Sequence, residues 1–592
     1  MCGLAGELRL DGRPADEAAV ARMSPCLRPR GPDSEGTWTD GRLALLHHRL
    51  KIIDLSAAGA QPMIDDELGL VLVFNGCIYN HQQLRAELAG VGYQFRSRSD
   101  TEVILKAYHR WGPRCVQRFA GMFAFAVYER DSGRLVLARD RLGIKPLYVA
   151  ELPGALRFAS TLPALVAAGD VDTTVDPVAL HHYMSWHSVV PPPRTILTGV
   201  RKLPPATVRT ISPDGGSRDL CYWNPPYTRP TGRVRSAQDW QDEILAALRT
   251  AVERRMVADV PVGVLLSGGL DSSLIVALLA ESGNSDLSTF SIGFAAAGGE
   301  RGDEFEYSDL VVDRFATKHH QIWIDDSRLV PAIDAAVAAM SEPMVSHDCV
   351  AFYLLSEEVS REVKVVQSGQ GADEVFAGYD WYPPLADVPR TEAAWAYSRA
   401  FVDRSAAVMA DLVSPRWLAD GDPSAGYLRG HFAAPGAETT LDAALRLDSR
   451  VMLVDDPVKR VDNMTMAWGL EARVPFLDHE LVEIAARCPP ELKLAAGGKG
   501  VLKAASRGIV PDAVIDRPKG YFPVPGVRHL HGPMLERVRD ALTSAPARDR
   551  GLFRPEAVEA LLADPNTKRT TLGSNVTWQL GLLEMWLQRM GV

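Results

Sequence analysis

The second half of the chain alternates short apolar runs with stretches of helical character. Residues 262–266 are apolar over a length that suits a buried strand, whereas residues 274–279 are apolar and free of Gly and Pro, as in a helix. The same pattern predicts further strands at 288–294 and 363–366, and helices at 237–257 and 307–316. Strands that alternate with helices indicate a doubly wound α/β sheet.

The first two hundred residues have a different pattern. Short β-rich runs are found at residues 70–74, 122–128 and 135–139, and stretches with helical spacing at 84–88 and 101–111. We therefore expect a sandwich of sheets in this half.

Pro and Gly cluster at two places between the halves. The periodic pattern fades at residues 190–193 and again at 221–232. We take the second cluster as the domain boundary. This predicts one domain at 2–215, a linker at 216–236 and a second domain at 237–592.

The composition is that of a globular protein long enough for two or more domains. The chain has 592 residues, of which 46% are apolar and 23% are charged. Its net charge is −10 and no run rich in Lys or Arg stands out. These features argue against a nucleic-acid partner, although a local basic groove stays open.

Cysteine usage and hydropathy bear on the compartment. The seven cysteines include no C-x-x-C pair, which fits a reducing compartment better than a disulfide framework or a zinc site. No apolar run approaches 18 residues, and the first residues lack a basic-then-apolar signal region. We expect a cytoplasmic protein without a membrane partner.

A polar loop, Ser267-Gly268-Gly269-Leu270-Asp271-Ser272-Ser273, joins the first predicted strand of the second half to its helix. Its two glycines let consecutive N–H groups form an anion nest, and the helix adds its positive dipole end. The hydroxyl groups donate further hydrogen bonds, and Asp271 can hold Mg²⁺ against the same phosphates. The loop lacks the Walker A string but resembles the SGGxDS loop of the ATP pyrophosphatase superfamily, whose members adenylate a substrate. A simple helix-capping turn is the alternative.

The chain begins with Met1-Cys2-Gly3. Removal of Met1 would leave Cys2 with a free α-amine. Its reference pKa of about 7.7–8.0 would let it take the proton from its own thiol. On this dipeptide alone, a small buried cysteine is the simpler interpretation.

Several motifs then follow in a fixed order. They are Arg30-Gly31-Pro32-Asp33, residues 48–54, Ala60-Gln61-Pro62, residues 74–80 and Ser99-Asp100-Thr101-Glu102. In order and spacing they resemble the class II glutamine amidotransferases, which are N-terminal-nucleophile glutaminases. The resemblance spans about residues 2–200. It implies an αββα sandwich with glutamine as a substrate.

The resemblance also implies catalytic roles in this half. Cys2 would attack the side-chain amide of glutamine, and the Asn75 side chain with the Gly76 N–H would form the oxyanion hole.

Glutamine binding would involve three more residues by the same resemblance. Arg49 would bind the α-carboxylate of glutamine, Asp100 would bind its α-ammonium, and Ile52 would line the pocket. The chain departs from the family at Cys77, where a glutamate that helps bind the α-ammonium is common. This predicts weaker glutamine binding, or another acid in its place.

A second loop, Ser368-Gly369-Gln370-Gly371-Ala372-Asp373, follows the predicted strand at 363–366. Together with the glutaminase motifs, the first loop, residues 470–478 and Lys499, it resembles the glutamine-dependent asparagine synthetases over nearly the whole chain. The resemblance implies an adenine nucleotide α-hydrolase-like second domain. It also implies an acyl-adenylate intermediate, with Lys499 facing the adenylate.

ATP and Mg²⁺ sites are implied in the same way, with Asp271 and Asp373 as the magnesium ligands. The implied ATP-binding residues are Leu265, Ser267, Gly268, Gly269, Asp271, Ser272, Ile292, Ser368 and Gly369. Leu265 and Ile292 would contact the adenine through backbone groups.

Gln370, also at the reacting centre, is a second departure, because asparagine synthetases usually carry a glutamate there. The chain is closer to a branch that makes N-acetylglutaminylglutamine amide, an osmoprotectant. There Tyr379, Trp381 and Tyr382 would offer the acceptor apolar surface with polar tips. We therefore expect a C–N ligase whose partners are glutamine, ATP and that carboxylate acceptor.

Several alternatives stay open. They are an asparagine synthetase that acts on aspartate, a glutamine- and ATP-binding regulatory protein that has lost activity, a tRNA-modifying enzyme and a GMP or NAD synthetase. The last two fit less well, because tRNA-modifying enzymes tend to have a basic surface or catalytic cysteine pairs and the other synthetases have differently built glutaminase parts. The oligomeric state is also open, a homodimer included.

Overall fold

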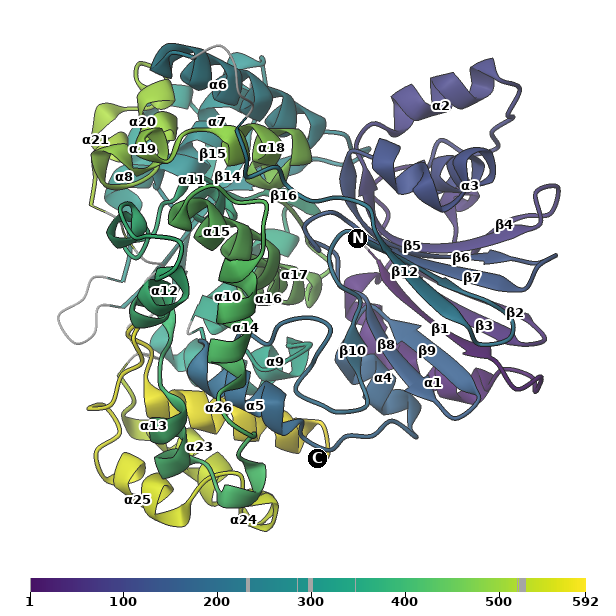
Figure 1. Ribbon diagram of the computed structural model, residues 1–592. Helices are drawn as coiled ribbons and strands as arrows, with labels where there is room; N and C mark the ends of the chain where they lie inside the picture. Colours follow the sequence, from purple (N-terminus) through teal and green to yellow (C-terminus); the bar gives the residue numbers. More distant parts are fainter. Residues whose placement is uncertain are drawn as a thin grey trace.

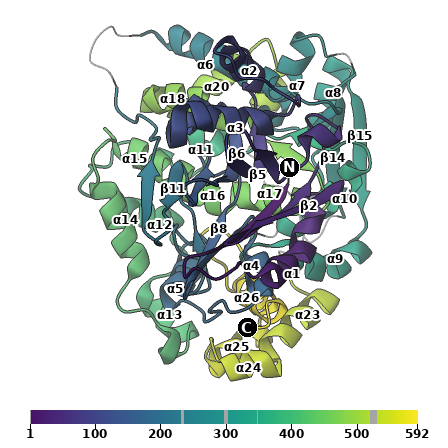
Figure 2. The same cartoon turned by 90° about the vertical axis from the view of Figure 1, so that its right-hand side faces the viewer.

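The structure, a computed structural model, describes residues 2–229, 235–284, 286–295, 302–346, 348–518, 520 and 529–592. It has two parts that lie side by side (Figure 1), and Figure 2 shows them turned by 90°. Residues 230–234, within the expected linker, lie outside the described residues.

The first part contains two six-stranded antiparallel sheets. The first has the order β10-β8-β9-β1-β3-β2 and the second β12-β11-β7-β6-β5-β4. The strands of the first sheet are β1 Gly3–Arg9, β2 Ser34–Asp40, β3 Leu43–Arg49, β8 Tyr148–Leu152, β9 Ala155–Ala159 and β10 Arg201–Lys202. Those of the second are β4 Met63–Asp65, β5 Leu70–Ile78, β6 Gly121–Glu129, β7 Arg134–Arg139, β11 Thr207–Ile211 and β12 Ser217–Cys221.

The two sheets stack face to face, with helices outside both. A shared core that includes Leu4, Val71 and Phe158 fills the space between the sheets. The outer helices are α1 Glu17–Leu27 and α4 Leu162–Ala168 on the first sheet, and α2 His81–Gly90 and α3 Asp100–Trp111 on the second (Figure 1). This αββα sandwich confirms the predicted architecture.

The second part is built on a five-stranded sheet whose paired strands are all parallel, in the order β15-β14-β13-β16-β17. Its strands are β13 Val262–Leu265, β14 Ser288–Phe294, β15 Lys318–Ile324, β16 Val365–Gln367 and β17 Glu471–Arg473. The helices connected with this sheet include α6 Ala237–Arg254, α7 Leu270–Glu281, α8 Phe305–Phe315, α9 Leu329–Ala339, α10 Asp348–Ser360, α11 Ala372–Phe376, α17 Pro457–Met466, α18 His479–Arg487 and α20 Gly500–Ser506.

A further helical layer completes the second part (Figure 1). Its helices include α5 Pro177–Ser185, α12 Ala393–Phe401, α14 Pro423–Ala433, α15 Thr440–Leu447, α23 Gly532–Thr543, α25 Pro555–Ala563 and α26 Val576–Arg589. Helix α26 packs on α9 and α23 with Trp586 fully buried. No helix among the described residues is long and apolar enough to cross a membrane.

The predicted strands and helices are found close to their expected places. Strand β14 covers the expected run at 288–294, and α7 extends the helical stretch at 274–279 toward the loop. The linker differs, because β12 pairs with β11 through Ser217–Cys221. The sheet of the first part therefore continues beyond residue 215, where we expected the linker to begin.

Buried ion pairs join the two parts. Asp462 on α17 receives Arg30 at 2.9 Å and Lys145 at 3.2 Å, both from the first part. Lys202 likewise meets Asp455 at 2.5 Å. Lys145 belongs to the turn after β7, and this turn therefore lies at the domain interface. Buried charges that pair across an interface hold it in one register.

Candidate active sites

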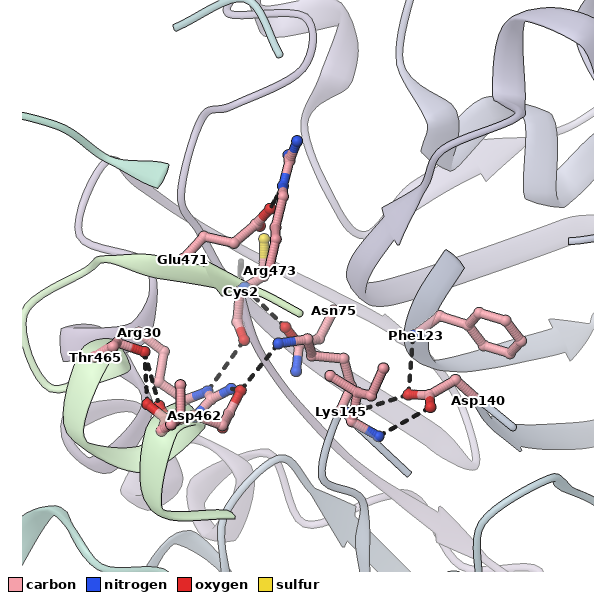
Figure 3. Close-up of polar contacts among 12 residues, drawn as sticks. Cys2, Arg30, Asn75, Phe123, Asp140, Lys145, Asp462, Thr465, Glu471 and Arg473 are labelled. Atoms are coloured by element: carbon pink, nitrogen blue, oxygen red, sulfur yellow. Dashed lines mark hydrogen bonds and ion pairs between the residues drawn. The ribbon is translucent and has the colours of Figure 1, made fainter. Parts of the chain in front are cut away.

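Cys2 lies immediately before β1 and is almost fully buried. Its backbone N–H donates to Oδ1 of Asn75 at 3.0 Å, and its carbonyl accepts from Nε of Arg30 at 3.2 Å (Figure 3). Burial raises the pKa of the Cys2 thiol, while Arg49 nearby acts in the opposite direction. The backbone of Cys2 is thus held by two side chains, with its thiol inside a pocket.

Asn75 and Gly76 lie on β5 beside Cys2. Because Oδ1 of Asn75 accepts from Cys2, the amide Nδ2 is a donor, and it is buried without a partner among the described residues. Gly76 has φ 156°, and a Cβ there would come within 2.1 Å of the Met122 carbonyl. Only glycine fits this position. A spare donor beside a buried thiol suits an oxyanion.

The pocket around Cys2 encloses about 30 Å³ and is lined by Arg49, Ile52, Gly76 and Asp100 among others. Arg49 donates to the carbonyls of Ser56 and Ile53, which fixes the direction of its guanidinium. The structure therefore brings together the side chains expected for glutamine, with Asn75 just behind the pocket wall.

Two residues from the second part line the same pocket, and the sequence analysis assigned them no role. Glu471 and Arg473, at the ends of β17, are both fully buried there (Figure 3). They lie almost four hundred residues from β5 along the chain. No local pattern in the sequence could have placed them beside Cys2.

A much larger cleft of about 540 Å³ opens at the carboxyl ends of β13, β14 and β16. Its lining includes most of the residues expected for ATP, namely Leu265, Ser267, Gly269, Asp271, Ser272, Ile292, Ser368 and Gly369. Gly268 has φ 72° and lies just outside the lining, and its carbonyl accepts from Arg517 at 2.9 Å. Arg517, which the sequence analysis missed, thus holds the glycine loop from one side.

Lys499 lies at the centre of this cleft between two carboxylates. Its Nζ is 2.6 Å from Asp271 and 2.9 Å from Asp373, so three residues from distant segments meet. Burial lowers the pKa of Lys499, but the two carboxylates outweigh it and raise the pKa. Lys499 has φ 53°, a left-handed conformation that non-glycine residues rarely adopt outside strained or functional positions.

Gln370 and Tyr379 line the same cleft, together with Asp348, Phe352 and Arg460. Tyr379 stacks on Trp381, with ring centroids 4.0 Å apart.

The expectation that Trp381 and Tyr382 also line the acceptor site is wrong. Tyr382 is fully buried and donates to Asp448 at 2.6 Å, and Trp381 donates to the same carboxylate at 3.4 Å. Both polar tips are therefore used inside the protein. Of the three expected rings only Tyr379 reaches the cleft.

Comparisons with known proteins give the family of each part of the chain. The model of the asparagine synthase family matches residues 243–588, and that of the glutamine amidotransferase domain matches residues 1–223. The chain belongs to the asparagine synthase family. It is 32% identical to asparagine synthetase 3 (glutamine-hydrolyzing) of Bacillus subtilis strain 168, over 88% of this chain and 87% of that protein.

Two further relatives extend the comparison. Asparagine synthetase 1 (glutamine-hydrolyzing) of the same bacterium is 31% identical over 92% of this chain and 90% of its own length. Asparagine synthetase B of Escherichia coli K12 is 30% identical over 88% of this chain and 82% of its own. This member of the asparagine synthase family is therefore an amidotransferase of the C–N ligase class, and enzymes of its family use ATP.

The donor set of the cleft can be tested against Mg²⁺. Among the described residues no three His, Cys, Asp or Glu side chains form a metal cluster. Mg²⁺ on a nucleotide needs only one or two carboxylates, because phosphate oxygens and water complete its coordination. Asp271 and Asp373, which both reach the Lys499 ammonium, fit that requirement.

Proposed function

We propose that this asparagine synthase family member hydrolyses glutamine at Cys2 and uses the ammonia to amidate a carboxylate that ATP has activated in the large cleft. The observation that carries the proposal is the buried Nδ2 donor of Asn75 beside the Cys2 thiol, in the same chain as the Lys499 cluster. The glutaminase would extend through β12 and the synthetase would begin at α6.

Glutamine hydrolysis would start with attack of the Cys2 sulfur on the side-chain amide carbon. With Met1 removed, the α-amine of Cys2 would take the thiol proton and return it to the leaving nitrogen, so that ammonia departs and a thioester remains. Nδ2 of Asn75 and the Gly76 N–H would stabilise the oxyanion. Water would then cleave the thioester to glutamate.

Amidation would proceed through an adenylate. A carboxylate oxygen of the acceptor attacks the α-phosphorus of ATP and pyrophosphate leaves. Ammonia then attacks the acyl carbon and AMP leaves. Lys499 would face the phosphate charge, while Asp271 and Asp373 would hold Mg²⁺, which neutralises the triphosphate when bound. The expected ATP residues at the carboxyl ends of the strands would grip the nucleotide.

Ammonia must cross from one pocket to the other without a proton, because ammonium has no lone pair. The buried pairs of Asp462 with Arg30 and Lys145 tie the two parts together. A closed interface of this kind supports transfer inside the protein rather than through solvent.

For the acceptor we favour N-acetylglutaminylglutamine, whose amide would be an osmoprotectant. Gln370 lies in the cleft as a neutral amide that can exchange hydrogen bonds with acceptor amides. Tyr379, held from behind by Trp381, offers a flat surface on which a planar amide can pack. A neutral dipeptide fits these partners well.

A second candidate acceptor is aspartate. The three relatives compared above are named asparagine synthetases, and the cleft also contains Asp348 and Arg460. A carboxylate and a guanidinium could bind the α-ammonium and the α-carboxylate of a free amino acid.

Comparing the two acceptors tests the choice. With ATP, Mg²⁺ and glutamine, we expect AMP and pyrophosphate to form faster with N-acetylglutaminylglutamine than with aspartate at equal concentration. Gln370→Glu should shift the preference toward aspartate, whereas the exposed control Gln117→Glu should not. Faster formation of asparagine by the wild-type enzyme would overturn the dipeptide and leave the amidotransferase proposal in place.

A further inference from the structure

The glutamine pocket has two carboxylates, and they come from different parts of the molecule. Asp100 belongs to α3 of the glutaminase, and Glu471 belongs to β17 of the synthetase sheet. Cys77 lies in the same wall. Burial raises the pKa of its thiol far above the usual range, so Cys77 carries no charge near neutral pH. Recognition of a cationic group in this pocket therefore depends on Asp100 and Glu471.

The two carboxylates differ in acidity. Burial raises the pKa of Asp100, and the negative charge of Glu471 adds to that effect. For Glu471 burial also acts to raise the pKa, but nearby cations outweigh it and lower the pKa to about 2: first the ammonium at the start of the chain, then the guanidinium of Arg473 and the ammonium of Lys145. Glu471 is thus the stronger acid and stays ionised.

Arg473 holds Glu471 in place. Its Nε donates to Oε1 of Glu471 at 2.5 Å, and its Nη1 donates to the carbonyls of Arg255 and Val257 at 2.7 and 2.8 Å. The other terminal nitrogen lies 3.8 Å from the sulfur of Cys77. With these contacts the guanidinium cannot turn, so Arg473 positions the carboxylate at the pocket wall.

We propose that Glu471 binds the α-ammonium of glutamine and so makes this pocket specific for an amide that carries an α-amino group. The inference rests on the proposed glutaminase at Cys2. Arg473 is the positioning residue. The synthetase part therefore supplies a specificity-determining side chain to the active site of the glutaminase.

The same strand reaches the other site. The carbonyl of Arg473 accepts the N–H of Ser368 at 2.8 Å, and Ser368 lines the ATP cleft. Glutamine bound to Glu471 would therefore contact a strand that is hydrogen-bonded directly to the loop that begins at Ser368. The ammonium contact and the ATP loop are separated by one residue and one hydrogen bond.

The test uses Glu471→Gln and two amides. Glutaramate is glutamine without its α-amino group, so it cannot use the proposed contact. In Glu471→Gln we expect kcat/KM for glutamine to fall by about ten-fold to one hundred-fold, mainly through KM, while glutaramate hydrolysis changes little. The control Glu362→Gln removes an exposed carboxylate just before β16 and should change neither reaction.

Two further measurements separate the outcomes. Ammonium-driven amidation should persist in Glu471→Gln, which shows that the variant folds. An equal loss on glutamine and glutaramate, with that activity intact, would overturn the role of Glu471, because the residue would then act on Cys2 or on packing alone. If wild-type glutamine hydrolysis survives Cys2→Ala, the proposed glutaminase itself fails.

Discussion

The two pockets of this enzyme differ in size and in the groups at their reacting centres. The pocket at Cys2 has a volume of about 30 Å³, with the Cys2 thiol in its lining and the Asn75 donor just behind its wall. The cleft at Lys499 holds about 540 Å³ and has an ammonium between two carboxylates. The smaller site also contains charged side chains, among them Arg49, Asp100 and Glu471, so the two sites differ in size and in the groups at their reacting centres.

This difference shows what each site must do when its substrate arrives. The glutaminase pocket is small, with a volume of about 30 Å³ among mostly buried side chains. The cleft already has room, but the pairs of Lys499 with Asp271 and Asp373 must rearrange when a triphosphate enters. Binding in the cleft therefore requires an exchange of ion partners.

Cys2→Ala would separate the two sites most sharply. Loss of the nucleophile should lower glutamine-driven amidation by at least ~10³-fold, because Cys2 is the group proposed to form the thioester. Amidation driven by ammonium salt should remain, since the cleft is untouched. The check is product formation with each nitrogen source. If the variant loses both activities, the division of roles is wrong.

Asn75→Ala tests the dipolar character of the smaller site. Removal of one oxyanion donor typically lowers kcat by about 10²- to 10³-fold. Steady-state glutamine hydrolysis gives the effect, and ATP–pyrophosphate exchange with the acceptor serves as the control. A normal glutaminase rate would mean that Nδ2 of Asn75 does not meet the oxyanion.

Asp373→Asn tests the charged character of the larger site. Replacing a carboxylate that balances Lys499 and would hold Mg²⁺ should slow adenylation by about 10²-fold, which is on the order of 2.7 kcal/mol. Glutaminase turnover should be unchanged. Pyrophosphate release measured over a range of Mg²⁺ concentrations gives the result, and a wild-type rate would remove Asp373 from the site.

The smallest effect concerns pH, where the two parts should respond with opposite sign. His47 lies on β3 and bonds to β5. Burial lowers the pKa of His47 to about 3. The stability that its neutral imidazole supports is therefore present above pH 6.5 and is lost as the pH falls. Burial raises the pKa of Asp448 to about 6, although donors from three rings oppose it. Its contribution is present below pH 3.8 and is lost as the pH rises through about 6.

Each group should change the free energy of unfolding by up to about 1.4 kcal/mol per pH unit between about pH 5 and 6. His47→Gln should remove a contribution to the free energy of unfolding that rises with pH. Asp448→Asn should remove a contribution that falls with pH. Urea unfolding at both pH values measures these slopes. Changes of slope with the same sign in the two variants, each relative to the wild type, would contradict the assignment.

Local motifs carried most of the prediction. The loop from Ser267 to Ser273 has its glycines and hydroxyls in consecutive positions, so its place between a strand and a helix is set by nearby residues. Asn75 and Gly76 were predicted from a motif of consecutive residues that resembles a known family, although their contacts are with Cys2 and with Met122 on β6. Both sites can be found from sequence because their motifs are runs of consecutive residues.

The parts that could not be predicted depend on long-range packing. Tyr382 is an aromatic residue with a hydroxyl group, as is common in binding sites. In the structure this hydroxyl donates a hydrogen bond to the buried Asp448 on a distant helix. Glu471 and Arg473 belong to a short strand whose pattern gives no sign of a partner across the interface. Their meeting with Cys77 follows from how two complete domains dock, which no window of sequence contains.

The position of β17 bears on how this enzyme can be engineered. It is an edge strand of the synthetase sheet, yet its side chains complete the wall of the glutaminase pocket. A chimera could join a glutaminase from another enzyme to this synthetase at the apparent boundary between the halves. Part of its glutamine pocket would then be formed by β17 of a synthetase that belongs to a different glutaminase. Such hybrids should regain glutamine use only when residues 471–473 travel with the glutaminase. The residues needed for glutamine hydrolysis therefore extend beyond the glutaminase domain.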